Sequence, residues 1–156
     1  VTGVQTCALP IYERQVDVIV DAILSVTKLQ PKPVVVLWGV AFKPNTDDIR
    51  EAPALKVAQR LLEKGVEVRA ADPIVTQAQI DAVAGKGRVS LVESEMKAAE
   101  GADVLVLVTE WRQYRSPDFD ELRTLMRGST LIDGRNQWSR RQVTAAGFTY
   151  LGIGRS

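Results

Sequence analysis

The chain has 156 residues, of which 46% are hydrophobic and 25% charged, and its formal net charge is +1. These values are typical of one globular domain with a sound core, and neither the charge nor any apolar run suggests nucleic acid or a membrane as a partner. Histidine is absent and Cys7 is the single cysteine, which excludes Ser-His-Asp and Cys-His nucleophile arrangements, the commonest zinc ligand and an intrachain disulfide. We therefore predict no metal site and a reducing, cytoplasmic location. Any general base or nucleophile is then a carboxylate or a lysine, or lies outside this chain.

The first 31 residues divide into two segments. Residues 1–11 have neither a helical nor a strand period and look like a translated sequencing adapter, so we expect them to be non-native and assign no role to Cys7. Tyr12–Leu29 is predicted to be a helix, because apolar residues recur at spacings of three and four until Pro31. Two interpretations stay open for this helix over residues 12–31: it packs on its own domain, or it is a connector or dimerisation helix.

From residue 32 to the C-terminus strands and helices are predicted to alternate. The predicted strands are Val34–Val40, Val66–Ala71, Val89–Val92, Asp103–Val108, Thr130–Asp133 and Phe148–Leu151. The predicted helices begin near Pro53 and then cover Val75–Ala84, Glu95–Glu100, Phe119–Met126 and Arg140–Ala146. This alternation, with fully apolar central strands, predicts an α/β fold with a doubly wound, mainly parallel, Rossmann-like sheet preceded by a connector helix.

The candidate binding residues follow strands, because ligands of open α/β sheets bind at the carboxyl ends of the strands. Gly39–Pro53 is a long polar connection with one glycine where a dinucleotide-binding turn has three. Three cations at this edge, Lys43, Arg50 and Arg135, suit an anion such as a diphosphate. Phe42 offers an apolar face to a base or a sugar ring.

Each of these polar groups has a structural alternative. Asp47 and Asp48 could pair with the cations of their own loop and order it. Asp72 could bind a ribose hydroxyl, but without the glycine fingerprint a turn-forming Asp-Pro is the better interpretation. Trp111 is more readily explained by packing than by stacking on a ligand, and Asp133–Asn136 could be a strand-ending turn or part of the site.

Several of these segments together resemble one family. Gly39–Pro53, Asp72-Pro73, Val104–Trp111 and Asp133–Asn136 look like the C-terminal, UDP-binding domain of the UDP-glucose/GDP-mannose dehydrogenase family, and the resemblance runs from Tyr12 to the C-terminus. Within the family, the chain looks most like the UDP-glucose 6-dehydrogenase branch. The UDP-N-acetylmannosamine and GDP-mannose dehydrogenases, which share the loop, remain alternatives.

The resemblance implies a role in an enzyme that oxidises the C6 alcohol of a nucleotide sugar to a carboxylate with NAD. It implies that Phe42, Lys43 and Arg135 contact the UDP-sugar and that Arg50 reaches the NAD. The main NAD domain, the catalytic cysteine and the central dimerisation region of the family have no counterpart here. We therefore expect an N-terminally truncated part of a homodimeric enzyme, without catalytic residues and inactive alone. A non-catalytic nucleotide-sugar-binding module and a self-contained NAD-binding domain are the alternatives.

Overall fold

The structure, a computed structural model, describes the backbone of residues 2–41, 49 and 52–153, and side chains within these ranges from Arg14 onward. Its centre is a six-stranded sheet in the order β3-β2-β1-β4-β5-β6, in which every neighbouring pair is parallel. The strands are β1 Val34–Trp38, β2 Glu67–Ala71, β3 Val89–Leu91, β4 Val104–Leu107, β5 Thr130–Asp133 and β6 Thr149–Gly152. The doubly wound parallel fold predicted from the sequence is confirmed.

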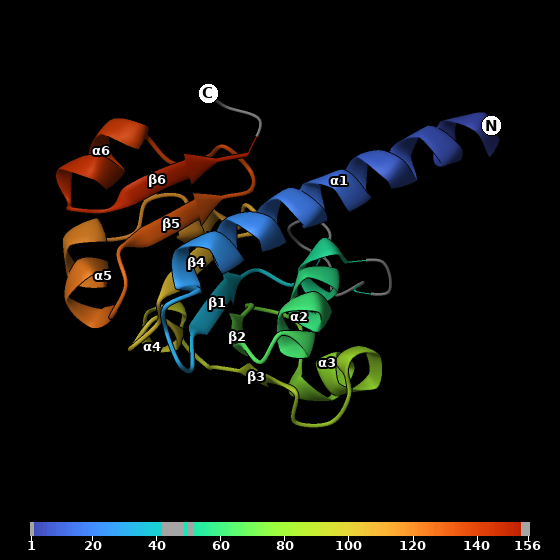
Figure 1. The fold of residues 1–156 in the computed structure, drawn as a ribbon, viewed down its shortest axis with the longest axis horizontal. Helices are drawn as coiled ribbons and strands as arrows, with labels where there is room; N and C mark the ends of the chain where they lie inside the picture. The colour runs from blue at the N-terminus through green and yellow to red at the C-terminus, as the bar shows by residue number, and fades with distance from the viewer. Residues whose placement is uncertain (1, 42–48, 50–51, 154–156) are drawn as a thin grey trace.

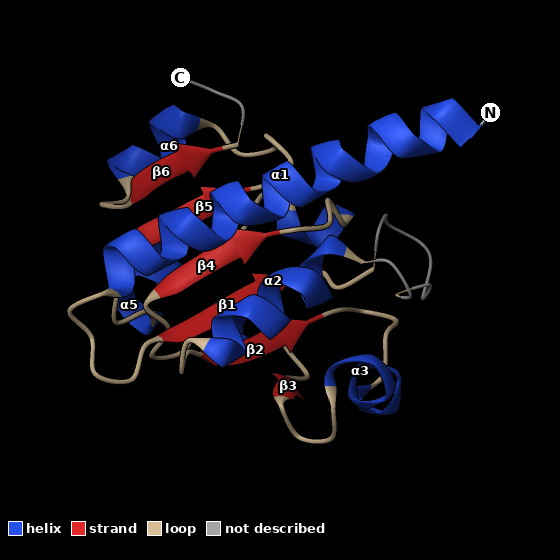
Figure 2. Cartoon of the chain, turned by 45° about the vertical axis from the view of Figure 1, so that its right-hand side comes forward, coloured by secondary structure: helices blue, strands red, loops and turns tan. Residues whose placement is uncertain are grey.

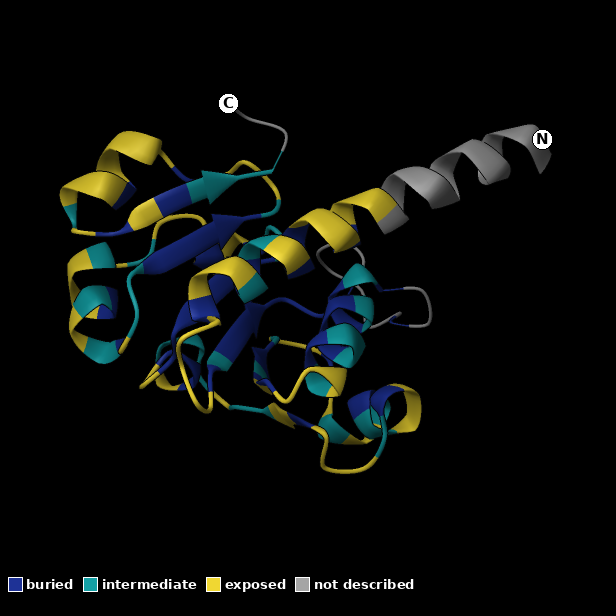
Figure 3. Ribbon diagram, viewed as in Figure 1, coloured by how far each residue is buried: buried dark blue, intermediate teal, exposed yellow. Residues whose placement is uncertain are grey.

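Helices cover both faces of the sheet. They are α1 Thr2–Thr27, α2 Pro53–Glu63, α3 Gln77–Ala84, α4 Glu95–Ala98, α5 Phe119–Leu125 and α6 Arg140–Ala145, with a short 3₁₀ helix, η1, at Arg112–Tyr114. Figure 2 shows α1 and α2 lying over the same face of the sheet. Val35 and Leu37 of β1 pack into the core on the side of α1, α2 and α3, whereas Val36 and Trp38 pack into the core on the side of α4, α5 and α6. This two-sided burial explains why β1 and β4 are apolar throughout, and Figure 3 shows the buried sheet between helices that are exposed on their outer sides.

The helix ends follow from local capping chemistry. The side chain of Thr76 accepts a hydrogen bond from the backbone of Gln79, whose own side chain accepts from the backbone of Thr76, so α3 begins at Gln77 and not at Val75 as predicted. Pro53 occupies the first turn of α2, where its missing N–H costs nothing. At the end of β1 the extended conformation stops at Trp38, two residues earlier than predicted, because Gly39 has a φ of +93°.

The first helix is longer than predicted. Residues 2–11, for which the sequence shows no helical period, continue the backbone of α1, since extending a helix costs less than starting one. That these residues are non-native stays a prediction. The side chains of Val16, Ile19, Val20 and Ile23 are buried in the core beside α2, so this part of the helix packs on its own domain. Figure 1 shows the amino-terminal part of α1 extending away from the sheet. Among the described residues, no helix combines the length and the apolar character that crossing a membrane requires.

An ion pair links segments at the amino-terminal ends of the strands. Asp103, only 5% exposed, accepts hydrogen bonds from Arg127 Nε (2.8 Å) and Nη2 (2.6 Å) and from the backbone N–H of Val34 (2.8 Å). Burial alone would raise the pKa of Asp103, but the hydrogen bonds from Arg127 and Val34 and the charge of Arg127 outweigh it and lower the pKa below its ordinary 3.8. The ionised carboxylate thus joins the start of β1 to the segment before β5.

The stabilising effect of Asp103 should depend on pH. Because its pKa is lower in the folded chain, its contribution is complete above the ordinary pKa of 3.8 and is lost as the pH falls through the folded value. The difference in unfolding free energy between the natural chain and Asp103→Asn should therefore be larger at about pH 7 than at about pH 3 in urea unfolding. Asp21→Asn, which removes an exposed carboxylate on α1, is the control. A difference for Asp103→Asn that does not change with pH would contradict this account.

Candidate functional site at the carboxyl ends of the strands

The loop that leaves β1 is held at its start by Asp72. The Oδ2 atom of Asp72 accepts hydrogen bonds from the backbone N–H groups of Val40 (2.9 Å) and Ala41 (3.4 Å). Its Oδ1 atom accepts from the N–H groups of Ile74 and Val75, both at 2.9 Å. Both carboxylate oxygens thus bind backbone N–H groups, which supports the turn-forming interpretation of Asp72 over the ribose-binding one.

The same loop is held from the other side by Thr109, which follows β4. Its Oγ1 donates a hydrogen bond of 2.6 Å to the carbonyl oxygen of Ala41. The two segments approach so closely that a Cβ built on Gly39 would lie 2.4 Å from the Cβ of Thr109. Gly39 therefore permits close contact between the ends of β1 and β4. The glycines of a dinucleotide-binding turn have a different role, which is to let the backbone approach a pyrophosphate.

The central part of the loop lies outside the described residues. This applies to Phe42, Lys43 and Arg50, predicted to bind ligands, and to the carboxylates Asp47 and Asp48. Before α2 the description resumes at Ile49 and Ala52, which are 5% and 2% exposed and belong to the core beside α1. Both ends of the loop are thus fixed to the domain.

Asp133 organises the segment after β5. It is completely buried, and its Oδ1 accepts a hydrogen bond from the backbone N–H of Arg135 (3.1 Å). Its Oδ2 accepts from the backbone N–H of Trp138 (2.7 Å) and from the hydroxyl of Tyr150 (3.0 Å). Three donors therefore satisfy this buried carboxylate, and the segment forms the strand-ending turn that was one of its two interpretations. That the segment also belongs to the binding site stays a prediction.

Arg135 is the one predicted ligand-binding residue that falls in the described part of the chain. Its Nε and Nη2 atoms donate hydrogen bonds to the two carboxylate oxygens of Glu110, which follows β4; the Nη2–Oε1 distance is 3.1 Å. The side chain of Arg135 is 40% exposed and that of Glu110 20% exposed. From the sequence, Glu110 is one of the polar groups that follow a predicted strand, with no partner and no ligand assigned to it. What could have indicated Glu110 is its position after β4, because β4 and β5 are parallel neighbours in which Leu107 is in register with Asp133.

The pair is charged at neutral pH. Burial alone would raise the pKa of Glu110, but hydrogen bonds from Arg135 and from its own backbone, with the charges of Arg135 and Arg115, lower the pKa. The carboxyl ends of the strands thus present an arginine whose guanidinium group is paired with Glu110 and partly exposed. Such a group suits a phosphate or a carboxylate.

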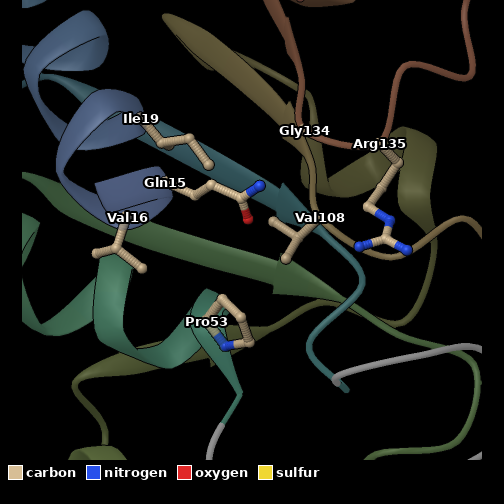
Figure 4. A pocket seen from close by; sticks show the side chains of 7 residues that line it. All are labelled: Gln15, Val16, Ile19, Pro53, Val108, Gly134 and Arg135. Carbon is tan, nitrogen blue, oxygen red and sulfur yellow. The ribbon is translucent and has the colours of Figure 1, made fainter. Parts of the chain in front are cut away.

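Beside Arg135 is a small recess between α1 and the strand ends, shown in Figure 4. Its volume of about 30 Å³ is far below the roughly 300–1,000 Å³ of a typical small-molecule pocket, so the recess does not enclose a ligand of that size. The residues that line it come from α1, the start of α2 and the segments that follow β4 and β5; they are Gln15, Val16, Ile19, Pro53, Val108, Gly134 and Arg135. Within the described part of the chain, no group of three or more cysteine or carboxylate side chains could hold a metal ion.

Trp111 lies in the core and not on the surface at the carboxyl ends of the strands. It is 7% exposed and belongs to the cluster that includes Trp38 and Tyr114. Its indole Nε1 is buried, with no hydrogen-bond acceptor among the described residues. The packing interpretation of Trp111 is therefore confirmed.

Comparison with known proteins identifies the family. Residues 36–140, which contain all four predicted ligand-binding residues, match the profile described as "UDP-glucose/GDP-mannose dehydrogenase family, UDP binding domain". The chain belongs to this family. The strand ends that carry Glu110, Arg135 and the anchored loop therefore lie within the UDP-binding domain of this family.

Similar proteins agree with this assignment. The UDP-glucose 6-dehydrogenase of Pseudomonas aeruginosa is 49% identical over 124 residues, which cover 78% of this chain and 27% of that protein. UDP-glucose 6-dehydrogenase TuaD of Bacillus subtilis is 35% identical over 143 residues, covering 92% of this chain and 31% of that protein. A solved UDP-glucose dehydrogenase from Pyrobaculum islandicum superimposes with a TM-score of 0.78 at 28% identity, over 99% of this chain and 33% of that one. The chain therefore spans about a quarter to a third of the length of the relatives it matches.

Proposed function

We propose that this chain is the C-terminal, UDP-sugar-binding part of an NAD-dependent UDP-glucose 6-dehydrogenase. The observation that carries the proposal is the 49% identity to such an enzyme over a stretch that covers 78% of this chain. In the whole protein the reaction is the oxidation of the C6 alcohol of UDP-glucose to a carboxylate. The partly exposed Arg135 at the carboxyl ends of the strands supports this proposal, because a UDP-sugar carries a diphosphate.

The proposal assigns a ligand to each of the four predicted binding residues at the carboxyl ends of the strands. Phe42, Lys43 and Arg135 contact the UDP-sugar, and Arg50 contacts the NAD. For Arg135 the support is geometric, since its guanidinium is partly exposed and held at the end of β5. For Phe42, Lys43 and Arg50 the support is their position in the loop whose two ends are anchored at the same edge.

The remaining parts of the reaction belong to other parts of a longer protein. The catalytic cysteine, its helpers and the main NAD-binding domain have no counterpart among the residues of this chain, so the chain alone binds UDP without oxidising a UDP-sugar. Helix α1 connects to those parts and contributes to a homodimer. The enzyme acts in the cytoplasm.

Titration of the purified chain with UDP, GDP and NAD⁺ tests this function. We expect saturable heat release with UDP in calorimetry and much weaker responses with GDP and NAD⁺. Tight binding of NAD⁺ without a response to UDP would favour a self-contained NAD-binding domain instead. A preference for GDP would assign the chain to the GDP-mannose branch.

Replacing Lys43 by Ala should weaken the binding of UDP. A charge-assisted contact with phosphate is worth about 1.5–3 kcal/mol, so the dissociation constant should rise on the order of tenfold to a hundredfold. Binding of uridine, which has no phosphate, should change little in the same calorimetric measurement. An unchanged dissociation constant for UDP would remove Lys43 from the site.

A further inference from the structure

We infer that Glu110 is a positioning residue, which holds the guanidinium group of Arg135 in the orientation that receives the diphosphate of the nucleotide. The inference rests on the proposed function, because it assigns a second residue to the same anion site. Glu110 comes from the end of β4 and Arg135 from the end of β5, so the pair forms only when the two strands lie side by side.

The geometry leaves part of the guanidinium group available to a ligand. Glu110 binds the edge formed by Nε and Nη2. The remaining nitrogen, Nη1, donates to no acceptor among the residues that the structure describes. A guanidinium group carries five N–H donors in a rigid plane, so fixing one edge by a carboxylate also fixes the direction of the other.

The main chain of Arg135 is held independently of its side chain. Its N–H donates to Asp133 (3.1 Å), and its carbonyl oxygen accepts from Nε2 of Gln137 (3.2 Å). The side chain beyond this point is 40% exposed, and without Glu110 it would sample many rotamers. Glu110 therefore supplies the one described side-chain contact that orients the charged group.

The ion pair of Glu110 and Arg135 should contribute little to the stability of the fold. Its effect on the orientation of Arg135 can therefore be measured without a large change in stability. Ion pairs that are this exposed stabilise a fold only slightly. Removing Glu110 should therefore leave the melting temperature nearly unchanged but weaken UDP binding about threefold to tenfold, because the freed side chain must be ordered again when the ligand binds. Uridine, which has no phosphate, should bind equally to the natural chain and to the variant without Glu110.

A double-mutant cycle on the full chain tests the inference. UDP and uridine affinities are measured for the natural chain and for Glu110→Ala, Arg135→Ala and the double variant. We expect Glu110→Ala to weaken UDP binding only while Arg135 is present, so that the double variant binds like Arg135→Ala. Glu63→Ala, which removes an exposed carboxylate at the far end of α2, is the charge-matched control and should bind UDP like the natural chain. Additive effects, or tighter UDP binding by Glu110→Ala, would overturn the inference while leaving the proposed function in place.

A second measurement needs no ligand and so separates this inference from the proposed function. The ¹⁵N signal of the Arg135 Nε–H group, assigned by its loss in Arg135→Lys, should be dispersed and slow to exchange in the natural chain. It should collapse into the averaged arginine signals in Glu110→Ala, and Glu110→Gln, which keeps one acceptor oxygen, should retain part of the dispersion. An Arg135 signal that is averaged in the natural chain overturns the inference, whatever the response to UDP. If the signal is dispersed but the natural chain does not bind UDP, the proposed function fails and the orientation of Arg135 by Glu110 stands.

Discussion

Replacing Gly39 by Ala should lower the unfolding free energy of the chain by about 3 kcal/mol, because two penalties add at this position. The φ angle of +93° is costly for any residue with a Cβ atom. The added Cβ would also lie 2.4 Å from the Cβ and 2.8 Å from the backbone nitrogen of Thr109, so the ends of β1 and β4 would have to separate. That separation breaks the hydrogen bond from Thr109 to Ala41, which holds the start of the predicted ligand-binding loop.

Gly65→Ala is the matched control for this experiment. Gly65 has a similar φ of +80°, but a Cβ built there meets no atom within 4 Å. It should therefore show only the backbone penalty, about 1–2 kcal/mol, and should leave UDP binding unchanged. Urea unfolding of both variants gives the two energies, and calorimetry gives the UDP affinities. Equal losses of stability in the two variants would show that the contact with Thr109 does not constrain the fold.

Replacing Asp133 by Asn should also cost about 3 kcal/mol of unfolding free energy. The buried carboxylate accepts from the backbone N–H groups of Arg135 and Trp138 and from the hydroxyl of Tyr150. An amide of the same shape offers one oxygen and turns its NH₂ group toward at least one of these donors, which leaves polar groups buried without partners. Because one of the donors is the N–H of Arg135, the substitution should weaken UDP binding as well.

Tyr150→Phe provides the comparison for Asp133→Asn. It removes one of the three donors and leaves the two backbone hydrogen bonds in place, so it should cost only about 1 kcal/mol and should not displace Arg135. Urea unfolding together with UDP calorimetry distinguishes the two variants. A Tyr150→Phe variant as unstable as Asp133→Asn would mean that the hydroxyl, and not the backbone of the Asp133–Trp138 segment, carries the effect.

The carboxyl edge was only partly predictable from the sequence. Asp72 could be recognised as a turn former because its partners Ile74 and Val75 are two and three residues away. Its hydrogen bond to Val40 spans 32 residues, and no local pattern indicates it. Likewise, the sequence indicated Arg135 by its charge and its position after a strand, but it gave no partner for it.

By itself, the sequence determined the kind and order of the elements, because periodicity, capping residues and turn formers act over a few residues. It also determined the family resemblance, which depends on consecutive residues such as those of Gly39–Pro53. Only the tertiary structure decided the strand order, the contact between Gly39 and Thr109 and the pairing of Glu110 with Arg135. These features depend on which strands become neighbours. Residues 25 positions apart in the chain meet only because β4 and β5 are paired and end at the same edge of the sheet.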